Sequence, residues 1–115
     1  MDIITGKISL NNTQFFDAGG FSGQVYVPND ANAGFNALLV TVNGRHPKKK
    51  MLDTTRSYFV VEGEGTFAVD DTSYQVTHGD LFVIEAGHTY EYSGNMKLFE
   101  FNVSADNSFQ DEKLE

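Results

Sequence analysis

Short apolar segments alternate with turn-forming residues from residue 37 onward, and this regular spacing limits the chain to a small set of folds. The segments recur about every 8–12 residues, which is typical of β-sandwiches and β-barrels. No helical periodicity interrupts them. The pattern therefore predicts an all-β protein. The expected strands are residues 37–42, 57–61, 66–69, 73–76, 81–84, 89–92 and 96–103.

The length and the strand pattern together predict one domain spanning residues 1–115. With 115 residues, 40% of them hydrophobic, the chain is large enough for one core and too short for two. We expect residues 37–103 to form the core of the domain, and residues 1–36, which are less regular, to supply outer strands and loops. Residues 104–115 are polar and acidic, so we expect this tail to fray.

Composition excludes several classes of protein. The absence of cysteine rules out disulfides, thiolate metal sites and a cysteine nucleophile. The sequence has no apolar run of about 18 residues, so we expect no membrane span. Its first residues do not resemble a secretory signal, so we expect a cytoplasmic protein. A net charge of −8 repels a phosphate backbone and disfavours nucleic acid as a partner.

Half of the basic residues stand in one short stretch. Arg45, Lys48, Lys49 and Lys50 are four of the eight lysines and arginines. Two interpretations of this stretch are open. It is either a solvated loop or lysine-protected edge strand, or a local anion-binding site on an acidic protein.

Strand alternation predicts which side chains point into the domain. In the expected strand near residue 57, one face carries Arg56 and Tyr58. In the strand near residue 90, one face carries His88, Tyr90 and Tyr92, while the alternate residues are polar. If this sheet has one face toward solvent, the aromatic face points inward. The sequence therefore predicts that these five side chains share the interior.

Glycines stand in a fixed frame across the predicted core, at Gly44 and Gly63 and again at Gly79 and Gly87. Glycine suits the tight corners of a barrel made of short strands, because it adopts positive φ without strain. This frame, with Arg56 at the matching position between the first two glycines, resembles the two motifs of the cupins. The resemblance covers about residues 37–103. It implies a single-domain jelly-roll barrel, also described as a double-stranded β-helix, built of antiparallel strands.

The residues that hold metal in cupins are replaced in this chain. Metal-binding members use three histidines and one glutamate around a divalent ion. The corresponding positions, for the two lengths of a variable gap, are Lys50, Leu52, Arg56 and Tyr90 or Lys49, Met51, Arg56 and Tyr90. Ammonium and guanidinium groups offer no free lone pair, and a neutral tyrosine is a poor ligand. We therefore expect no metal and no cofactor.

The three histidines have different expected roles. His46 precedes a proline in an expected loop and His78 lies in an expected turn, so we interpret both as solvated or hydrogen-bonded residues. His88 shares the predicted face of Tyr90, so we expect it at the wall of the cavity. Whether any of the three contributes to a non-standard metal site stays open.

The resemblance and the inward residues predict that the barrel binds a small anionic or polyhydroxylated molecule of the sugar or carboxylate type. A guanidinium matches carboxylate or phosphate, and aromatic walls suit a sugar or a ring face. The expected ligand-binding residues are Lys49, Lys50, Arg56, Tyr58, His88, Tyr90 and Tyr92. The alternative is a filled scaffold in which Arg56 is paired internally with Glu100, Asp53 or Glu91.

Other functions remain open beside simple binding. An isomerase, epimerase or lyase would use His88 or Tyr90 as general acid or base, with Arg56 stabilising an enolate-like charge. A metal-dependent dioxygenase or isomerase, also implied by the resemblance, is disfavoured by the missing ligands. The resemblance further implies a homodimer. The apolar residues of the N-terminal strands that could form its seam are Ile8, Leu10, Val25 and Val27.

Overall fold

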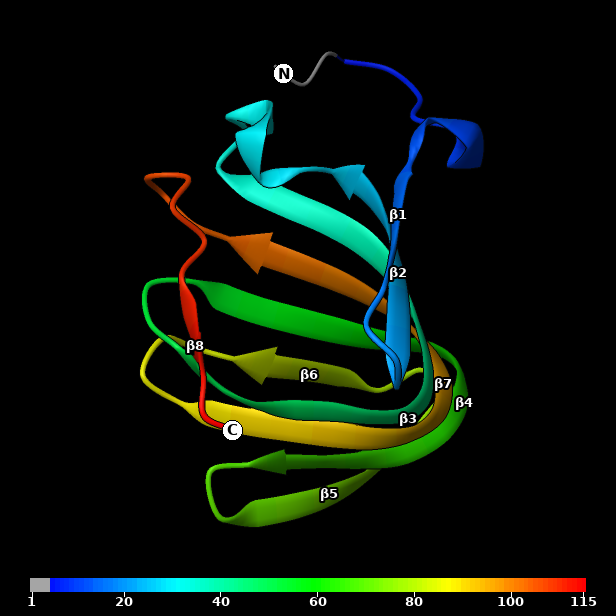
Figure 1. The fold of residues 1–115 in the computed structure, drawn as a ribbon, viewed down its shortest axis with the longest axis vertical. Coiled ribbons are helices and arrows are strands. Elements are labelled where there is room, and N and C mark those ends of the chain that lie inside the picture. Colours follow the sequence, from blue (N-terminus) through cyan, green and yellow to red (C-terminus); the bar gives the residue numbers. More distant parts are fainter. Residues whose placement is uncertain (1–4) are drawn as a thin grey trace.

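Three long antiparallel strands build most of the domain, and the computed structural model describes residues 5–115 (Figure 1). The strands are β1 (Gln14–Asp17), β2 (Phe21–Val27), β3 (Phe35–Met51), β4 (Thr55–Val69), β5 (Thr72–Thr77), β6 (Leu81–Ile84), β7 (Thr89–Val103) and β8 (Asp111–Lys113). Two short 3₁₀ helices, η1 (Leu10–Asn12) and η2 (Asn29–Ala31), precede the long strands. The predicted all-β class is confirmed. None of the helices in residues 5–115 has the length and apolarity needed to cross a membrane.

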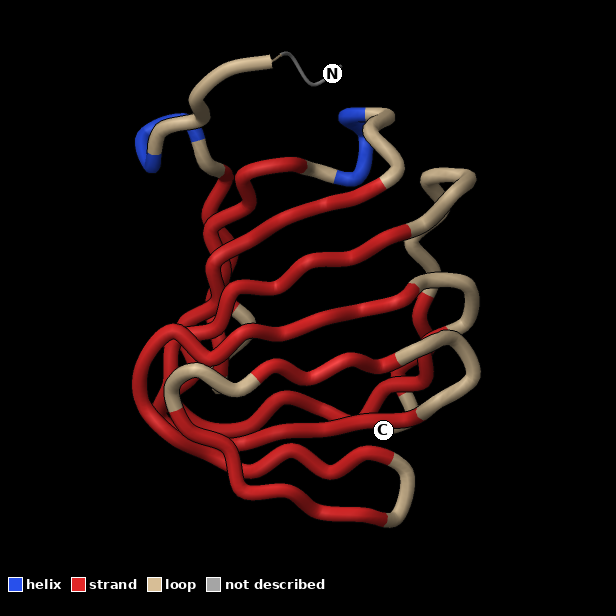
Figure 2. Tube along the Cα trace, turned by 180° about the vertical axis from the view of Figure 1, so that it is seen from behind, coloured by secondary structure: helices blue, strands red, loops and turns tan. Residues whose placement is uncertain are grey.

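The eight strands form one continuous hydrogen-bonded sheet, and the three long strands bend so that its two halves enclose the core; we call these halves the first sheet and the second sheet (Figures 1 and 2). The first sheet has the order β1-β2-β3-β7-β4-β6, and its long strands contribute residues 35–42, 96–103 and 55–60. The second sheet has the order β8-β3-β7-β4-β5 and uses residues 43–51, 89–95 and 62–69 of the same strands. All of these neighbours are antiparallel. This arrangement is the predicted jelly-roll barrel.

The seven predicted segments form five strands, because the expected turns near Gly65 and Gly94 are bends within β4 and β7. Gly94 lies in register with Gly44 of β3 on one side and with Gly65 of β4 on the other. Its φ is +143°, and a Cβ there would lie 2.6 Å from the carbonyl oxygen of Glu64. The missing side chains let the three strands approach closely and bend together from the first sheet into the second.

The main core fills the space between the two sheets. Its buried apolar residues are Leu38, Val40, Val42, Met51, Tyr58, Val60, Phe67, Val76, Ile84, Tyr90, Tyr92, Met96 and Leu98. Val25 packs against this core, and Ile8 packs against a smaller cluster in which Val27 is buried. Of the expected seam residues, Val27 is buried, Ile8 and Val25 are partly exposed and Leu10 is exposed, and the seam itself stays a prediction.

The C-terminal tail is anchored to the barrel, so the expectation that it frays is wrong. Strand β8 pairs with residues 49–51 at the end of β3 (Figure 1). The carboxylate of Glu115 pairs with the guanidinium of Arg45 and accepts a hydrogen bond from the Lys48 backbone N–H at 2.9 Å. Composition alone does not reveal this, because the polar residues of the tail find polar partners on the basic stretch of β3.

Replacing Gly94 by alanine should lower the free energy of unfolding by at least about 2 kcal/mol, because the new Cβ would overlap the β4 backbone. Gly79→Ala is the matched control. Gly79 also has a positive φ, at +90°, but a Cβ added there would have no neighbouring atom within 4 Å. We therefore expect Gly79→Ala to lower the free energy of unfolding by about 1 kcal/mol, from backbone strain alone. Urea unfolding measures both losses, and equal losses would contradict a steric role for Gly94.

Candidate functional site

A buried arginine organises the polar groups inside the barrel. Arg56 on β4 donates from Nε to Asn102 Oδ1 at 2.6 Å and from Nη1 to the Tyr90 hydroxyl at 2.7 Å. Its Nη2 donates to Asp111 Oδ2 at 3.1 Å, and Glu100 Oε2 lies 3.3 Å from Nε. The arginine is only 8% exposed, so its charge requires these partners. Glu100 is one of the three acids that the sequence suggests as partners of Arg56. Arg56 is therefore paired inside the barrel.

Two tyrosines connect this network across the interior, Tyr58 from the first sheet and Tyr90 from the second. Tyr58 and Tyr90 are fully buried, and their hydroxyl groups share a hydrogen bond of 2.8 Å. Burial raises the pKa of Tyr90 to about 12 and raises that of Tyr58 well above its usual value. Both phenols therefore stay protonated at neutral pH and act as hydrogen-bond donors as well as acceptors.

An asparagine completes the network on the first sheet. Asn102, with its side chain fully buried, donates from Nδ2 to Asn36 Oδ1 at 2.7 Å and to Glu100 Oε2 at 2.8 Å. The sequence prediction missed Asn102 as a site residue. The sequence does contain a pattern that indicates Asn102, because positions 98, 100 and 102 continue the inward alternation of Tyr90 and Tyr92 along β7.

His46 also lies inside the barrel, so the expectation of a loop at this position is wrong and the side chain is not solvated. Its side chain is buried and stacks on Tyr92 and Tyr90, with ring centroids 4.6 and 5.3 Å apart. Burial, assisted by the charges of Lys49 and Arg56, lowers the pKa of His46 to about 3, so the imidazole is neutral at physiological pH. The proline after His46 suggested a loop, but β3 continues through it and keeps the histidine on the inward face.

Two buried polar atoms in this region form no hydrogen bond of normal geometry among residues 5–115, although the Pro47 backbone lies near the imidazole of His46 and the Tyr58 hydroxyl lies near that of Tyr92. They are Nδ1 of His46 and the hydroxyl of Tyr92. Buried polar atoms nearly always have a partner, and an unpartnered one costs about 1–3 kcal/mol. The two rings stack on each other, so their free polar atoms belong to one region of the interior. This region can donate to and accept from a polar molecule.

His88 is not part of this interior, and the prediction that it points inward is wrong. Its side chain is 50% exposed, and Nδ1 lies 2.7 Å from Asp70 Oδ2. The same carboxylate accepts a hydrogen bond from the Thr89 backbone N–H at 3.0 Å. His88 precedes the first residue of β7, so strand alternation does not extend to it. The hydrogen bond with Asp70 raises the pKa of His88, and His78 is exposed as expected.

The two lysines of the prediction differ in position. Lys49 is partly buried and its Nζ lies 3.3 Å from Asp111 Oδ2, whereas Lys50 is exposed. Met51 is fully buried, and Leu52 is 43% exposed. Lys49 and Met51 therefore point inward, whereas Lys50 and Leu52 do not. This agrees with the gap length that places Lys49 and Met51 at the motif positions.

Lys49, Met51, Arg56 and Tyr90 carry an ammonium, a thioether, a guanidinium and a phenol, and their correspondence to the metal ligands of other cupins stays a prediction. These groups do not fit a hard or borderline divalent cation. Residues 5–115 also hold no group of three His, Cys, Asp or Glu side chains placed to bind a metal ion. The side chains of the interior are therefore suited to hydrogen bonding and not to metal coordination.

Charge around the arginine is balanced, as in the alternative in which Arg56 is paired internally. Arg56 and Lys49 carry two positive charges, and Glu100 and Asp111 carry two negative charges within 3.3 Å of them. Asp111 comes from the anchored tail. Tyr58, Tyr90 and Tyr92 lie inside the barrel beside this group. Whether these tyrosines bind a ligand stays a prediction.

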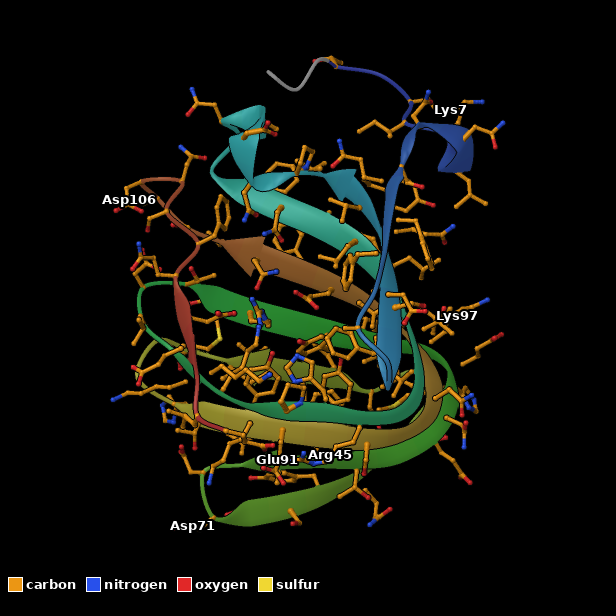
Figure 3. The ribbon with its side chains drawn as sticks, in the orientation of Figure 1. Lys7, Arg45, Asp71, Glu91, Lys97 and Asp106 are labelled. Atoms are coloured by element: carbon orange, nitrogen blue, oxygen red, sulfur yellow. The ribbon has the colours of Figure 1, made fainter. Side chains whose placement is uncertain are left out.

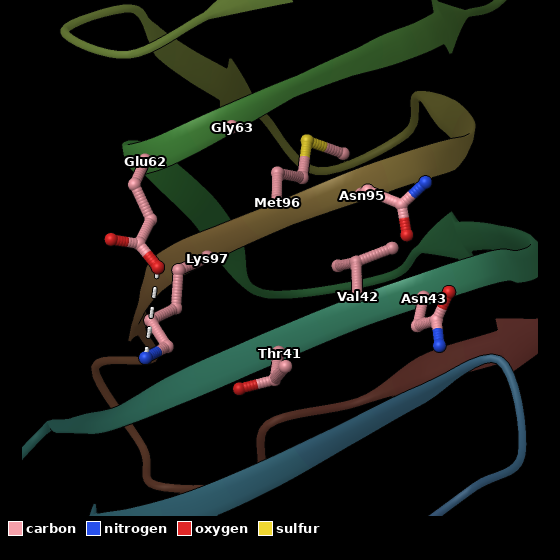
Figure 4. A pocket seen from close by; sticks show the side chains of 8 residues that line it. All are labelled: Thr41, Val42, Asn43, Glu62, Gly63, Asn95, Met96 and Lys97. Atoms are coloured by element: carbon pink, nitrogen blue, oxygen red, sulfur yellow. Dashed lines mark ion pairs between the residues drawn. The ribbon is translucent and has the colours of Figure 1, made fainter.

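A separate pocket of about 400 Å³ lies at the bend between the sheets and contains none of the predicted site residues (Figure 4). Its walls include Thr41, Asn43 and Asn95 and the ion pair of Glu62 with Lys97, whose charged atoms are 3.8 Å apart. Strand alternation places these side chains outside the barrel, opposite the inward residues of β3 and β7. It is therefore distinct from the buried network.

Comparisons with known proteins agree with this architecture. Residues 45–113 match the family described as the AraC-like ligand binding domain. No curated protein matches the chain. Several solved structures share its fold at identities of 20% or less, and at such identities the likeness shows the fold alone.

The structure of a Streptomyces PAC13 variant with uridine has a TM-score of 0.85 and 18% identity, covering 97% of this chain and 92% of that one. Another structure of Pac13, described as a nucleoside dehydratase, has a TM-score of 0.84 and 20% identity, covering 96% and 92%. The cupin domain of Cnp3 from Schizosaccharomyces pombe has a TM-score of 0.69 and 15% identity, covering 84% and 72%. Ectoine synthase from P. lautus has a TM-score of 0.73 and 12% identity, covering 89% and 78%. The cupin fold is thereby shown.

Acidification should destabilise the protein through His46. Its pKa of about 3 lies below the ordinary value of 6.5, so its contribution to stability is complete above pH 6.5 and is lost as the pH falls toward 3. Urea unfolding between pH 7 and pH 5 should show the free energy of unfolding falling by up to about 1.4 kcal/mol per pH unit. His46→Gln should reduce this slope.

His88→Gln is the matched control for this measurement. The pKa of His88 is raised, so its contribution is present below pH 6.5 and is lost as the pH rises through the folded-state value. The control should therefore be less stable than wild type by a constant amount below pH 6.5, keep the slope between pH 6.5 and pH 5, and approach wild type as the pH rises. A His46→Gln slope equal to that of wild type would show that the imidazole is not held neutral.

Proposed function

The chain belongs to the AraC-like ligand-binding domain family, and from this premise we propose that it binds a neutral, polyhydroxylated small molecule of the sugar or nucleoside type inside the barrel. One observation carries this proposal. The buried polar atoms of His46 and Tyr92 form no hydrogen bond of normal geometry among residues 5–115, beside a network whose other members are well paired. Hydroxyl groups of a ligand both donate and accept, so they suit a neutral imidazole and a phenol together.

The charge balance favours a neutral ligand over an anion. Arg56 and Lys49 already have carboxylate partners in Asp111 and Glu100. An anion would have to displace Asp111 or bind close to its negative charge, and both are energetically unfavourable. A neutral polyol avoids both. The sequence leaves anionic and polyhydroxylated ligands equally open. The position of Asp111 favours the second.

The aromatic lining supports a ligand with a ring face. His46 and Tyr92 stack on each other, and Phe67 lies 4.8 Å from Tyr92 between ring centroids. The neighbours with uridine include one His-to-Gln and two Tyr-to-Phe variants of PAC13. The altered residue types are those that line the interior of this chain. We therefore take uridine as the first probe of the site.

Uridine should raise the melting temperature of the wild-type protein. A ligand at 10 times its Kd adds about 1.4 kcal/mol of stability, which is about 6 °C for a domain of this size. Tyr92→Phe removes an unpartnered hydroxyl, so it should leave the stability of the free protein unchanged or raised while the shift with uridine falls. Tyr74→Phe, at an exposed position, is the control and should keep the full shift.

Tyr58→Phe sharpens this comparison. The Tyr58 hydroxyl forms a hydrogen bond with the Tyr90 hydroxyl, so its removal should lower the free energy of unfolding of the ligand-free protein by about 1 kcal/mol or more. If uridine raised the melting temperature of Tyr92→Phe as much as that of wild type, the result would contradict the proposed site. An absent shift with uridine, ribose and glucose alike would contradict the ligand class.

Asp111→Asn should change the preference of the site for charge. Removing one carboxylate leaves a local charge of about +1, so binding of uridine 5′-monophosphate relative to uridine should improve by about 10-fold, or about 1.4 kcal/mol. Asp70→Asn, outside the barrel, is the control and should leave the preference as in wild type. Calorimetric titration measures both ratios. An unchanged ratio in Asp111→Asn would show that Asp111 does not set the charge preference.

A lyase or isomerase is the second candidate function, and the description of Pac13 as a nucleoside dehydratase favours it. The sequence offers His88 as the acid or base, but that side chain is exposed, so His46 takes the role in this proposal. With a pKa of about 3 in the free protein, His46 is a weak base, so this proposal requires a bound ligand that raises its pKa, while Tyr90, still protonated, donates to a developing oxyanion.

Proton exchange separates this function from simple binding. Wild-type protein in D₂O should exchange the carbon-bound proton next to the carbonyl group of a ketose or aldose probe, as followed by NMR. His46→Gln should bind the probe without exchange. Exchange that persists in His46→Gln would remove the histidine from the mechanism, and binding without exchange in wild type would favour the first function.

A further inference from the structure

The ends of the three long strands lie together on one side of the barrel, opposite the row of glycines. Strand β3 begins in the first sheet at Phe35 and ends in the second sheet at Met51, and β4 and β7 follow the same curved path beside it (Figure 1). Figure 3 shows Asp106 on the side of the strand ends and Lys97 on the side of the bend. We call the side that holds the strand ends the open end of the barrel.

Residues 104–115 cross the open end from the first sheet to the second. The backbone N–H of residue 104 donates to the Gly34 carbonyl oxygen at 3.0 Å, next to the start of β3. Farther along, the Leu52 N–H donates to the Gln110 carbonyl oxygen at 3.1 Å, and β8 then pairs with the end of β3 in the second sheet (Figure 1). This segment therefore connects the two sheets across the open end. We call residues 110–115 the strap.

Hydrogen bonds and ion pairs hold the strap in place, and apolar burial contributes little. The Leu114 N–H donates to the Lys48 carbonyl oxygen at 2.9 Å, and the carboxylate of Glu115 pairs with Arg45. Every residue of the strap is exposed or partly exposed, including its one large apolar side chain, Leu114. A segment with few buried apolar contacts opens at a lower free energy than the core of a protein, so the strap is able to open locally.

The backbone just before the strap is strained. Phe109 has a φ of +49°, in the left-handed region that bulky side chains rarely adopt. Such a conformation raises the energy of the docked strap relative to a released strap, in which the backbone of Phe109 can relax. Strain of this kind persists only where the surrounding contacts impose it, and here the contacts of the strap with β3 do so.

The charges of the interior act in the opposite direction. Asp111 Oδ2 lies 3.1 Å from Arg56 Nη2 and 3.3 Å from Lys49 Nζ. Release of the strap would leave both cations without this carboxylate, which is unfavourable for groups that are largely buried. The docked strap is therefore the stable state, and its release is transient.

We infer that the strap is a gate, which releases from β3 while the barrel stays folded and thereby opens the interior at the open end. Met51 of β3 lies in register with Asp111 of the strap, and its side chain is fully buried in the core. Release therefore gives water and small molecules access to this side chain. For the ligand proposed above, the strap sets the rates of entry and exit, and this part of the inference rests on the proposed function.

Oxidation of Met51 by hydrogen peroxide measures the release directly. Met51 is buried next to the strap and Met96 is buried at the bend, so mass spectrometry of peptides compares two sites in one molecule. Leu114→Pro removes the N–H that donates to Lys48, so it should make oxidation of Met51 about 5-fold faster and leave Met96 unchanged. Leu114→Ala keeps this N–H and is the matched control, which should oxidise at the wild-type rate.

A second pair of variants tests the release without changing the backbone. Glu115→Gln removes the ion pair with Arg45, so oxidation of Met51 should become about 3-fold faster. Glu112→Gln removes the same charge from an exposed residue of the strap that forms no ion pair among residues 5–115, so it should keep the wild-type rate. Thermal unfolding followed by circular dichroism shows whether each variant is folded.

Two results of the oxidation experiment would overturn the inference. One is a wild-type rate at Met51 in both folded Leu114→Pro and folded Glu115→Gln. The other is an equal acceleration at Met51 and Met96, which would assign the effect to unfolding of the whole barrel.

Stopped-flow binding of uridine tests the gating role. Leu114→Pro should raise the rates of association and dissociation by about 5-fold each and keep the Kd within about 2-fold of wild type, because both rates depend on the same open state. Unchanged rates beside faster oxidation of Met51 would overturn the gating role. If wild type does not bind uridine, the proposed ligand is wrong, and the oxidation of Met51 still decides whether the strap opens.

Discussion

The paired charge of Arg56 is the interaction on which the interior of the barrel depends. A guanidinium that is 8% exposed is tolerated only because β7 and the tail bring oxygen atoms to it. Glu100 and Tyr90 lie ten residues apart on one strand, and the bend at Gly94 is what brings both to the same arginine. Breaking such a buried pair costs several kcal/mol, so the bend, the network and the anchored tail stabilise one another.

Two histidines show what sequence alternation predicts and where it fails. Alternation along β7 correctly directs Tyr90 and Tyr92 inward, and it would add Asn102 if it were followed further. It fails for His88, because the strand begins one residue later and the Asp70 carboxylate holds the ring outside. It fails for His46, because Pro47 suggests the end of a strand. Proline is compatible with a strand where the register shifts, and β3 has such an irregularity at this position.

Glycine is also ambiguous in the sequence. The same residue serves a hairpin turn and a bend within a long strand, and local propensity does not separate the two. Pairing separates them, since Gly44, Gly94 and Gly65 lie in one row across three strands. The tail was unpredictable for a related reason. Its contacts join residues more than 50 positions apart, such as Arg56 with Asp111, and no local pattern encodes them.

The row of glycines also divides the outer surface of the barrel into a polar and an apolar part. On one side of the row the outward residues are polar, and β8 brings Asp111 to the buried network at the edge of that second sheet. On the other side the outward residues include large apolar side chains, such as Phe59, Phe99 and Phe101. Because Asp111 pairs with both Arg56 and Lys49, the charge balance of the interior depends on β8 staying paired with β3.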